Sequence, residues 1–365
     1  MTAGEQSGNR VRGRRQGAAW TQAELAERAG VSRSAIAAIE NERLVPSVEA
    51  ALGIAAALGC SVEELFGSGT SPTHRNEPVW AWDPPAPQWR AWGAEVGGRT
   101  LLFPIESDGP TAWQEPDVTD VAGTPPVPAP KTPTTLVVAG CDPVAGTLAR
   151  LYEQMTGFRM LVIPRSSRQS LELLAGGLVH VAGMHLATPE EPARNAEAIA
   201  QRIDAPVMTV RLADWEEGLA VGSRFGTLSI RSLVRSRARW VGRDAGSGAR
   251  QCMEERLPAT IKPAHLARDH RGVAEAIRSG WADAGVCLRL SCEEAGLVFR
   301  PLQTEHFEIA FRSELQHDPR IQGLLRVLRS AEYHRGVSGI PGYSCSRTGE
   351  MQALSPRPAP LSRST

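Results

Sequence analysis

The sequence predicts an all-α N-terminal domain, a connector rich in tryptophan and proline, and a C-terminal two-lobed α/β domain. Residues 21–41 have the spacing of two short helices joined by a tight turn. From residue 134 onward, short apolar runs alternate with amphipathic segments, a pattern typical of parallel strands joined by helices. The expected divisions are an N-terminal domain at 1–67, a connector with a small β element at 68–133, an α/β domain at 134–350 and a disordered tail at 351–365.

The first of the two helices is expected at residues 22–29. Its apolar residues recur on one side, as in a short amphipathic helix. Gly30 follows where the helix has to stop, because glycine enters the left-handed backbone conformation without steric penalty. The sequence therefore indicates both this helix and its end.

The second helix is expected at residues 33–41. Ser32 stands just before it, and its hydroxyl can accept a hydrogen bond from a free amide of the first turn. Ile36 and Ile39 are expected to face the first helix. The residues expected to face outward are Arg33, Ser34, Ala37, Ala38 and Asn41.

This pattern resembles the helix-turn-helix of the phage-repressor-like (XRE) regulators, and the match continues to Phe66. The resemblance implies that the domain binds double-stranded DNA with its second helix in the major groove. It places the DNA-binding residues at Gln22, Ser32, Arg33, Ser34, Ala37, Ala38 and Asn41. Within this set, the resemblance assigns phosphate-backbone contacts to Gln22 and Asn41.

The resemblance makes Arg33 and Ser34 the base readers, and arginine suits guanine because its fork pairs with two acceptors at once. Ala37 and Ala38 depart from the family pattern, since an alanine can at best touch a thymine methyl. Affinity is therefore expected to draw on a basic N-terminal arm. Its residues are Arg10, Arg12, Arg14 and Arg15. The alternative is a helix-turn-helix used only for protein contacts.

Composition sets broad limits. With 365 residues and 42% apolar content, the chain can bury a sizeable core and should form two or three domains. The formal net charge is zero, so any nucleic-acid binding must be local. The six cysteines show no Cys-x-x-Cys pair, and we expect reduced thiols, no metal site and no cofactor. Nothing resembles a signal peptide or a membrane span, which predicts a cytoplasmic protein without membrane contact.

The connector contains one segment with the composition of a strand, residues 99–105. Its tryptophans are expected to pack against a neighbouring domain or a second subunit, rather than to bind an aromatic ligand. They are Trp80, Trp82, Trp89, Trp92 and Trp113. Residues 124–133 are dense in proline and predict an extended, semi-rigid spacer.

The α/β pattern predicts a defined order of elements. Strands are expected at 135–139, 160–163, 179–182, 239–242, 284–286, 297–301 and 307–311. Helices are expected at 143–155, 167–174, 248–256, 273–279 and 320–330. This order suggests two lobes with a crossing near residues 217–222.

Three strand-to-helix turns have the composition of anion-binding sites, at residues 140–143, 164–167 and 244–250. Helix N-termini offer unpaired amides and the positive end of the helix dipole, and glycine permits close approach. Ligands of open α/β sheets bind beyond the carboxyl ends of the strands, where these turns fall. Facing each other across a cleft, the turns could surround a small anion.

The turn at 240–250 and further segments up to residue 350 are similar to the periplasmic-binding-protein-like domain related to molybdate and tungstate binders. The resemblance implies a ligand pocket formed by Cys141, Asp142, Ser166, Ser167, His185, Ser247, Gly248, Ala249 and Arg250. A carboxylate at Asp142 would repel a dianion unless it points away or pairs with an arginine. For His180, we expect a packed structural role.

The combined resemblances predict a DNA-binding transcription regulator, not an enzyme, that senses a small anion such as molybdate or tungstate. Its expected partners are an operator in double-stranded DNA, the anion and a second copy in a homodimer. Two alternatives are a regulator that senses a molybdopterin-like organic anion and a DNA-binding protein whose vestigial cleft serves as an interaction scaffold. A third is an enzyme with Cys141 as nucleophile, assisted by His185.

Overall fold

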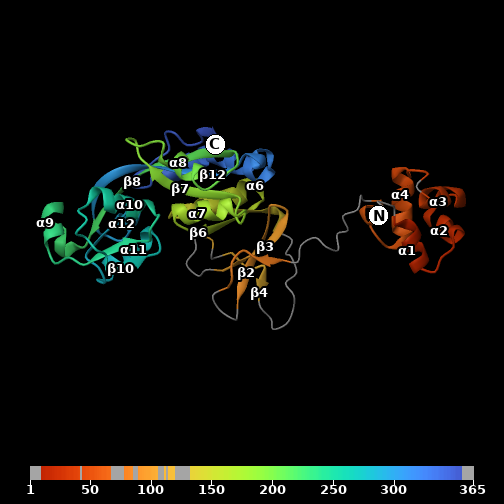
Figure 1. Ribbon diagram of the computed structural model, residues 1–365, viewed down its shortest axis with the longest axis horizontal. Helices are drawn as coiled ribbons and strands as arrows, with labels where there is room; N and C mark the ends of the chain where they lie inside the picture. Colours follow the sequence, from red (N-terminus) through yellow and green to blue (C-terminus); the bar gives the residue numbers. More distant parts are fainter. Residues whose placement is uncertain are drawn as a thin grey trace, which may run out of the picture. The chain divides into compact units, whose positions relative to one another are not determined.

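The computed structural model describes residues 10–41, 43–66, 78–84, 89–105, 111, 114–119 and 132–355. The chain forms two compact units, Met1–Glu77 and Pro78–Thr365, and Figure 1 shows the elements of each. Trp113, the spacer at 124–131 and the tail from residue 356 lie outside the described residues. Among the described residues, no helix has the length and apolar content needed to cross a membrane.

The N-terminal unit is built from helices alone in its described part. They are α1 (Val11–Gly17), α2 (Gln22–Ala29), α3 (Arg33–Glu40), α4 (Val48–Leu58) and α5 (Val62–Phe66). Both predicted helices are present. Thr21 caps α2, and Gly30 ends it with a φ of 69°. Ser32 caps α3 by accepting a hydrogen bond from the amide of Ala35. The second helix ends one residue earlier than predicted, with Asn41 as its C-cap.

The predicted basic arm is wrong as a description of residues 11–15, because they belong to helix α1. Val11 is fully buried in the core of the unit, together with Leu25, Ile36 and Ile54. The apolar contact of Val11 with the rest of the domain holds this segment in place. Arg12 and Arg14 are therefore exposed on a packed helix, whereas the Arg15 side chain is only 11% exposed.

A small four-stranded sheet opens the C-terminal unit. Its strands are β1 (Val79–Trp80), β2 (Arg90–Val96), β3 (Arg99–Pro104) and β4 (Val118–Thr119), in the order β1-β3-β2-β4. Gly97 and Gly98 both have positive φ and form the tight β2–β3 turn. Trp92 and Phe103 share one buried core with Val137 and Leu161 of the main sheet. The expected β element is thus part of the C-terminal unit.

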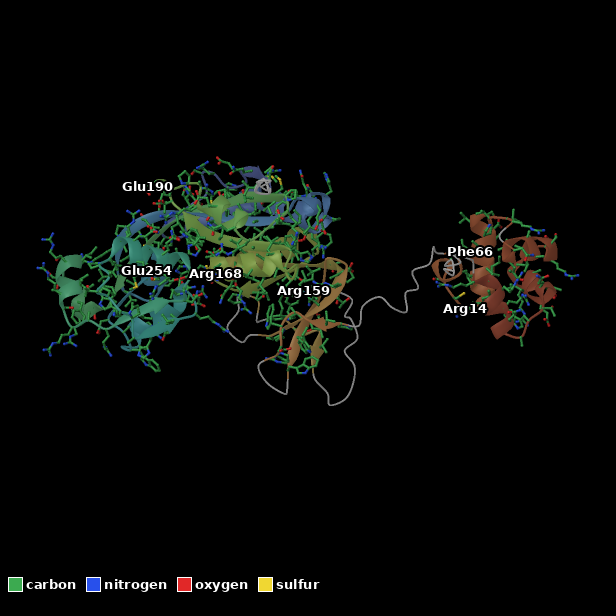
Figure 2. The ribbon with its side chains drawn as sticks, viewed as in Figure 1. Arg14, Phe66, Arg159, Arg168, Glu190 and Glu254 are labelled. Atoms are coloured by element: carbon green, nitrogen blue, oxygen red, sulfur yellow. The ribbon has the colours of Figure 1, made fainter. Side chains whose placement is uncertain are left out.

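An ion pair buried from solvent joins the small sheet to the main one. Arg159, at the start of β6, donates to both carboxylate oxygens of Asp117 at 2.7 and 2.5 Å. It also donates to the carbonyl of Gly93 at 2.7 Å, and the Arg159 side chain is only 4% exposed. Figure 2 labels Arg159 where the two sheets meet.

The main sheet has ten strands. They are β5 (Thr135–Gly140), β6 (Arg159–Pro164), β7 (Val181–Ala187), β8 (Val207–Val221), β9 (Trp240–Arg243), β10 (His265–Ala267), β11 (Ala284–Leu288), β12 (Val298–Arg312), β13 (Tyr343–Ser344) and β14 (Met351–Leu354). The spatial order is β10-β9-β11-β8-β12-β7-β5-β6, with β13 and β14 also paired to β8.

Helices cover both faces of this sheet. They are α6 (Ala145–Thr156), α7 (Ser167–Ala175), α8 (Arg194–Ala200), α9 (Ile230–Arg235), α10 (Gly248–Arg256), α11 (His270–Arg278), α12 (Arg289–Glu294), α13 (Pro319–Leu328) and α14 (Ala331–Ser338). Short 3-10 helices occur at η2 (Thr132–Thr134), η3 (Ser223–Phe225) and η4 (Ser313–His317).

Two long antiparallel strands, β8 and β12, run through both lobes (Figure 1). The strands predicted at 297–301 and 307–311 are one strand, which shifts register against β8 at 301–303 and 307–308. We call residues 216–305 the second lobe, which carries β9, β10 and β11. The first lobe comprises the rest of the unit, including β5, β6 and β7. The predicted crossing near 217–222 falls within β8.

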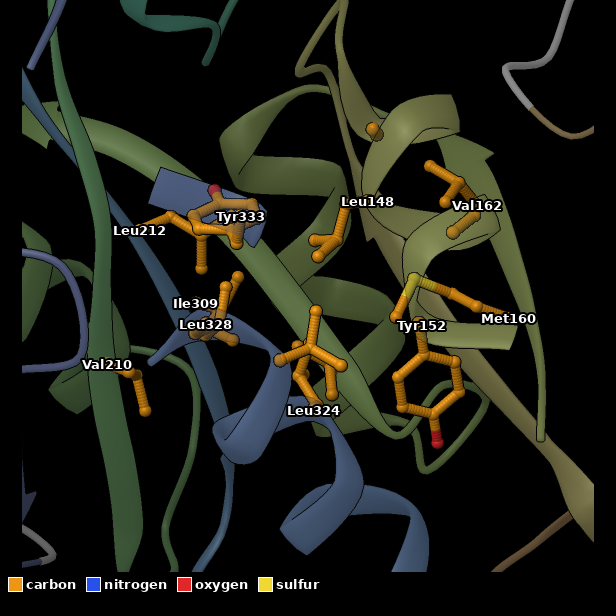
Figure 3. Close-up of a cluster of buried hydrophobic side chains, with 14 of the residues drawn as sticks. Leu148, Tyr152, Met160, Val162, Val210, Leu212, Ile309, Leu324, Leu328 and Tyr333 are labelled. Carbon is orange, nitrogen blue, oxygen red and sulfur yellow. The ribbon is translucent and has the colours of Figure 1, made fainter. Parts of the chain in front are cut away.

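The tail prediction is wrong at its start, because residues 351–354 form β14 and pair with β8 at 207–210. The strand predicted at 179–182 begins later, at Val181, and continues to Ala187. The core of the first lobe lies between the sheet and α6, α13 and α14. Figure 3 shows Leu148 and Tyr152 of α6 beside Leu324 of α13 in this core.

We expect Asp117→Ala to destabilise the C-terminal unit by about 3–5 kcal/mol, because it leaves the guanidinium of Arg159 buried without its counter-ion. Urea unfolding of the full chain measures the change. Asp83→Ala, an exposed aspartate of the same segment, is the matched control and should change stability by less than about 0.5 kcal/mol. Equal effects of the two variants would show that the ion pair does not hold the sheets together.

Candidate functional site

The outer surface of α3 carries most of the residues predicted to contact DNA. Arg33, Ser34 and Asn41 are exposed, whereas Ala37 and Ala38 are half-buried. Ser32 accepts a hydrogen bond from Ala35 as the cap of α3. Its hydroxyl also lies 3.0 Å from the Ser34 hydroxyl. The helix thus presents one arginine and a pair of hydroxyls at its N-terminal end.

Glu40, a buried residue of α3, joins this surface to α1 and α2. Its carboxylate accepts hydrogen bonds from Arg15 of α1 at 2.6 Å and from Gln22 of α2 at 2.9 Å. Arg12 donates to Asn41 at 2.5 Å. Burial would raise the pKa of Glu40, but the hydrogen bonds from Arg15 and Gln22 lower it. Sequence reasoning missed Glu40, because the pairing joins residues 18 and 25 positions apart.

In the C-terminal unit, the N-termini of α7 and α10 meet across the boundary between the lobes. The amide of Arg168 donates to the carbonyl of Gly246 at 3.2 Å, and Figure 2 labels Arg168 at this boundary. A Cβ atom at Gly248 would lie 2.4 Å from His185 Nδ1. Glycine is therefore required at position 248 for this approach of the two lobes.

A chain of three buried side chains begins behind this contact. Cys141 Sγ lies 3.1 Å from His185 Nε2, and His185 Nδ1 lies 2.6 Å from Glu305 Oε2. Trp215 Nε1 donates to the same Glu305 oxygen at 3.0 Å, while Gln303 donates to the other at 2.8 Å. Cys141 follows β5, His185 is on β7 and Glu305 is on β12. Trp215 and Gln303 hold the Glu305 carboxylate in place, and Glu305 in turn fixes the orientation of the His185 ring.

Three further buried residues surround this chain. His270 begins α11, Glu217 is on β8 and Arg243 ends β9; each is at most 1% exposed. His270 Nδ1 lies 3.8 Å from Glu217 Oε1. Arg243 lies 3.7 Å from Asp244. Within the described part of the chain, the side-chain nitrogens of Arg243 and His270 have no hydrogen-bond partner. Glu217 has none as an ionised carboxylate, but in its protonated form it can donate to Glu305.

We call these six residues the interlobe cluster: Cys141, His185, Glu217, Arg243, His270 and Glu305. Unpaired buried polar groups cost free energy, so this many in one place indicates a site that receives a ligand. Two of its residues come from the first lobe and four from the second. The unpaired groups all belong to the second lobe, and Cys141 and His185 of the first lobe lie beside His270. A ligand in contact with both sets would bind both lobes.

The pKa values of the buried groups in the cluster are shifted in opposite directions. Burial and then the neighbouring Glu305 raise the pKa of Glu217 well above its ordinary value. Burial would also raise the pKa of Glu305, but His185 and its hydrogen bonds lower it. Burial, followed by the charges of Arg243 and His185, lowers the pKa of His270 well below its ordinary value. These shifts favour an ionised carboxylate at Glu305, a protonated carboxyl group at Glu217 and a neutral imidazole at His270.

Most of the other predicted pocket residues have structural partners. Ser167 accepts a hydrogen bond from the amide of His185 at 3.2 Å. The amide of Ser166 donates to Gln169 at 3.1 Å, but the Ser166 hydroxyl is buried without a partner among the described residues. Ser247 caps α10. The Asp142 carboxylate accepts from Tyr343 at 2.9 Å, and burial raises the pKa of Asp142 to about 6.

Two predicted pocket residues point elsewhere. Ala249 packs into the core of the second lobe. Arg250 donates to Glu254 at 2.6 Å, with its side chain 32% exposed. Arg250 therefore forms a surface ion pair with a residue one helical turn further along α10. The neighbouring Ser247 and Gly248 face the lobe boundary.

Sequence reasoning named Cys141 and His185 as pocket residues, and Arg243 as a charge that could neutralise the site, but it missed the other three members of the cluster. Glu217, His270 and Glu305 lie on different elements, and none belongs to a recognisable spacing. The available signal was a charged residue inside an apolar strand, as at Glu217 beside residues 218–221. Such a residue is buried with a partner or faces a site.

His180 has the packed role expected of it. Its Nδ1 accepts a hydrogen bond from the amide of Val137 at 3.0 Å, and its Nε2 donates to the carbonyl of Glu95 at 2.9 Å. The contact with Val137 requires the neutral ring, because a protonated Nδ1 cannot accept a hydrogen bond. Burial lowers the pKa of His180 to about 4.

Comparison with protein families agrees with this division of the chain. Residues 11–65 match the helix-turn-helix family, and residues 148–329 match the PBP superfamily domain. The chain joins a helix-turn-helix domain to a PBP domain. The PBP match covers most of both lobes and includes all of the interlobe cluster except Cys141.

Two proteins of known sequence resemble parts of this chain. A protein from Bacillus subtilis (strain 168), described as uncharacterized protein YvgK, is 24% identical over 226 residues, 59% of this chain and 73% of that protein. A Clostridium pasteurianum protein from the 5′ region of a 2Fe-2S ferredoxin gene is 26% identical over 83 residues, which is 22% of this chain and 74% of that protein.

Solved structures of similar fold include transporter components and a regulator domain. The tungstate ABC transporter of Geobacter sulfurreducens has a TM-score of 0.44 at 14% identity, covering 56% of this chain and 97% of that one. The regulatory domain of MetR, a LysR family regulator from N. meningitidis, has a TM-score of 0.40 at 11% identity, covering 57% and 98%.

We expect the stability of the PBP domain to fall as His180 becomes protonated. The folded state holds His180 neutral down to about pH 4, whereas the unfolded chain protonates it near pH 6.5. Its stabilising contribution is therefore complete above pH 6.5 and is lost as the pH falls towards 4, by about 3 kcal/mol in all.

His180→Gln should remove this part of the pH dependence, although the variant is less stable at pH 7 because it loses hydrogen bonds. Urea unfolding between pH 7 and 4 measures the slope for the parent and the variant. His317→Gln, at an exposed histidine, should keep the parent slope. An unchanged slope in His180→Gln would contradict the assignment.

Proposed function

We propose that this protein is a DNA-binding transcription regulator whose PBP domain senses a small ligand held between its two lobes. One observation supports the proposal most directly. A helix-turn-helix domain shares a chain with a PBP domain whose lobes meet at a buried cluster of unpaired polar groups. DNA binding and ligand binding would then be functions of the two separate units.

On the DNA side, α3 would enter the major groove. Arg33 is exposed at its N-terminal end, where a guanidinium can pair with the two acceptors of a guanine. Gln22 is held by Glu40, and Asn41 by Arg12, so both amides are fixed beside α3. Preorganised polar groups of this kind suit contacts to the phosphate backbone.

The regulator would bind paired half-sites as a homodimer. The helix-turn-helix domain exposes a group of large apolar side chains on and before α4, and exposed apolar groups of this kind favour association. They are Leu44, Val45, Val48 and Leu52, with 47%, 90%, 79% and 57% of their surfaces exposed. A second copy of the chain could cover them.

For the ligand, we propose a small anion such as molybdate or tungstate, with a molybdopterin-like organic anion as the alternative. The meeting N-termini of α7 and α10 and the buried guanidinium of Arg243 support an anion. The carboxyl groups of Glu217 and Glu305 oppose it. An anion would therefore bind at the Arg243 side of the cluster or together with a cation.

The contacts around Cys141 also favour a second candidate. A thiol beside a histidine, with a carboxylate behind it, is the arrangement of a nucleophile, its base and an orienting acid. A nucleophile has to reach its substrate, however, and Cys141 is only 8% exposed. We therefore place an enzymatic role second. Fast alkylation of Cys141 by iodoacetamide at neutral pH would reverse that order.

We expect Arg33→Ala to weaken binding to the operator by about 1–3 kcal/mol and to relax the base preference at one position of each half-site. The loss follows from removing a bidentate contact to one base. Fluorescence anisotropy with an operator selected from random DNA measures both affinity and stoichiometry.

Arg231→Ala removes an equal charge from an exposed site of the PBP domain and is the matched control. It should bind the operator as the parent does. If Arg33→Ala kept the parent affinity for both operator and random DNA, α3 would not be the base-reading helix.

We expect one anion of a panel to raise the melting temperature of the full chain. Ligand at about 100 times its Kd adds roughly 2.7 kcal/mol of stability. Arg243→Met should lose this shift, whereas Arg250→Ala, whose guanidinium pairs with Glu254 at the surface, should keep it. The panel contains molybdate, tungstate, sulfate, phosphate and pterins, each with and without EDTA.

The same panel is then tested for its effect on operator binding. A ligand can shift a two-state protein only by its differential affinity for the states. The sensing anion should therefore change the operator affinity of the parent and not that of Arg243→Met. No effect of any anion on stability or DNA binding would favour the scaffold alternative.

A further inference from the structure

We propose that the interlobe cluster is a binding site for a thiophilic transition-metal ion, held by Cys141, His185 and His270. This inference rests on the proposal that the ligand site lies between the lobes, and it gives that site a cation. Sequence reasoning predicted no metal site, because the three residues are 44 and 85 positions apart in the chain. The fold brings them together.

The three donor atoms are close enough to share one ion. One ligand atom from each of Cys141, His185 and His270 lies within 4.8 Å of the other two. Cys141 Sγ and His185 Nε2 are 3.1 Å apart. Ligands of a tetrahedral zinc ion, with bonds of about 2.3 Å to sulfur and 2.0–2.1 Å to nitrogen, are separated by about 3.5 Å. The Cys141–His185 pair would need a movement of a few tenths of an ångström, and the His270 donor atom lies within 4.8 Å of both.

His270 provides the second, independent observation. Its ring is completely buried, and neither nitrogen has a hydrogen-bond partner in the described part of the chain. A buried polar group without a partner is unfavourable. The fold places this histidine among donors that bind metals, and coordination would satisfy one of its nitrogens.

Each histidine has a carboxylate behind it. Glu305 lies 2.6 Å from His185 Nδ1, and Trp215 and Gln303 hold Glu305 in place. Glu217 lies 3.8 Å from His270 Nδ1. Metal-binding histidines usually donate their other N–H group to a carboxylate, which fixes the ring and strengthens the ligand. Glu305 makes this contact with His185, whereas Glu217 lies near His270 but beyond hydrogen-bond distance. The His185–Glu305 pair thus gives a buried carboxylate a function that an anion site does not.

The donor set selects the class of ion. A thiolate and two imidazoles suit Zn²⁺, Co²⁺ or copper, whereas Mg²⁺ and Ca²⁺ prefer oxygen donors. Three protein ligands leave a fourth position for water or a small anion. A dication would also offset the carboxylates that oppose an anion in this cleft.

The ion would join the two lobes directly. Cys141 and His185 belong to the first lobe, and His270 starts α11 of the second lobe. Arg271, the next residue, donates to the carbonyl of Pro143 at 3.2 Å across the same boundary. Metal bound here would favour the closed arrangement of the lobes, which is the kind of differential affinity that a sensor needs.

The test is metal binding by the reduced, EDTA-treated full chain, first with Zn²⁺ by calorimetry and then with Co²⁺ by absorption. We expect one Zn²⁺ per chain and a thiolate-to-cobalt charge-transfer band in the near ultraviolet. Cys141→Ser should abolish the band, and His270→Gln should weaken Zn²⁺ binding at least tenfold.

Two variants are matched controls. Cys345→Ser and His265→Gln change residues outside the cluster, one partly and one fully exposed, and both should bind Zn²⁺ and Co²⁺ as the parent does. Melting curves without metal check that all variants fold. His270→Cys should restore binding and intensify the charge-transfer band, an outcome that a merely structural role of His270 would not produce.

The proposal would be overturned if the parent bound no Zn²⁺ or Co²⁺, or if Cys141→Ser bound them unchanged. This measurement needs neither DNA nor an anion. Its failure would leave the proposed regulator intact, with an anion as the ligand. Conversely, a protein that binds metal but no DNA would retain the metal site and lose the proposed function.

Discussion

The contact between the two lobes at His185 determines how the PBP domain can work. The backbone of the second lobe approaches this ring so closely that only glycine fits at position 248. The approach shuts Arg243 and His270 away from water without giving them hydrogen-bond partners in the described residues. Burial of unpaired polar groups is expensive. A ligand that satisfied these groups would favour the closed lobes, and under the proposed function this preference would couple the ligand to the shape of the domain.

Local signals were sufficient for most of the fold. Helix α10 occupies residues 248–256, as the sequence predicted, since a serine cap and an amphipathic pattern define it locally. Helix α1 was missed because its one apolar residue, Val11, is meaningful only when the rest of the domain packs against it. The unity of β12 was also hidden, because two bulges interrupt its alternation. Elements defined by distant contacts therefore escaped prediction.

The site was less predictable than the fold for the same reason. Turn composition identified Cys141, Ser166 and Ser247, which lie near the lobe boundary. It could not identify Glu305 or His270, whose importance arises from their neighbours in space. The composition of the turns also indicated an anion, because amides at helix ends are visible in sequence while buried carboxylates from other strands are not.

The two long strands have a consequence for how a signal could leave the PBP domain. The second lobe is an insertion: the chain enters it through β8 and returns through β12, so both of its ends are fixed in the first lobe. The N-terminal unit is tethered through Pro78 and the small sheet, whose core is shared with the first lobe. If the second lobe rotates on ligand binding, this attachment to the first lobe stays unchanged. Under the proposed function, the signal would then leave the domain through a surface of the second lobe, such as a contact with the same lobe of another copy.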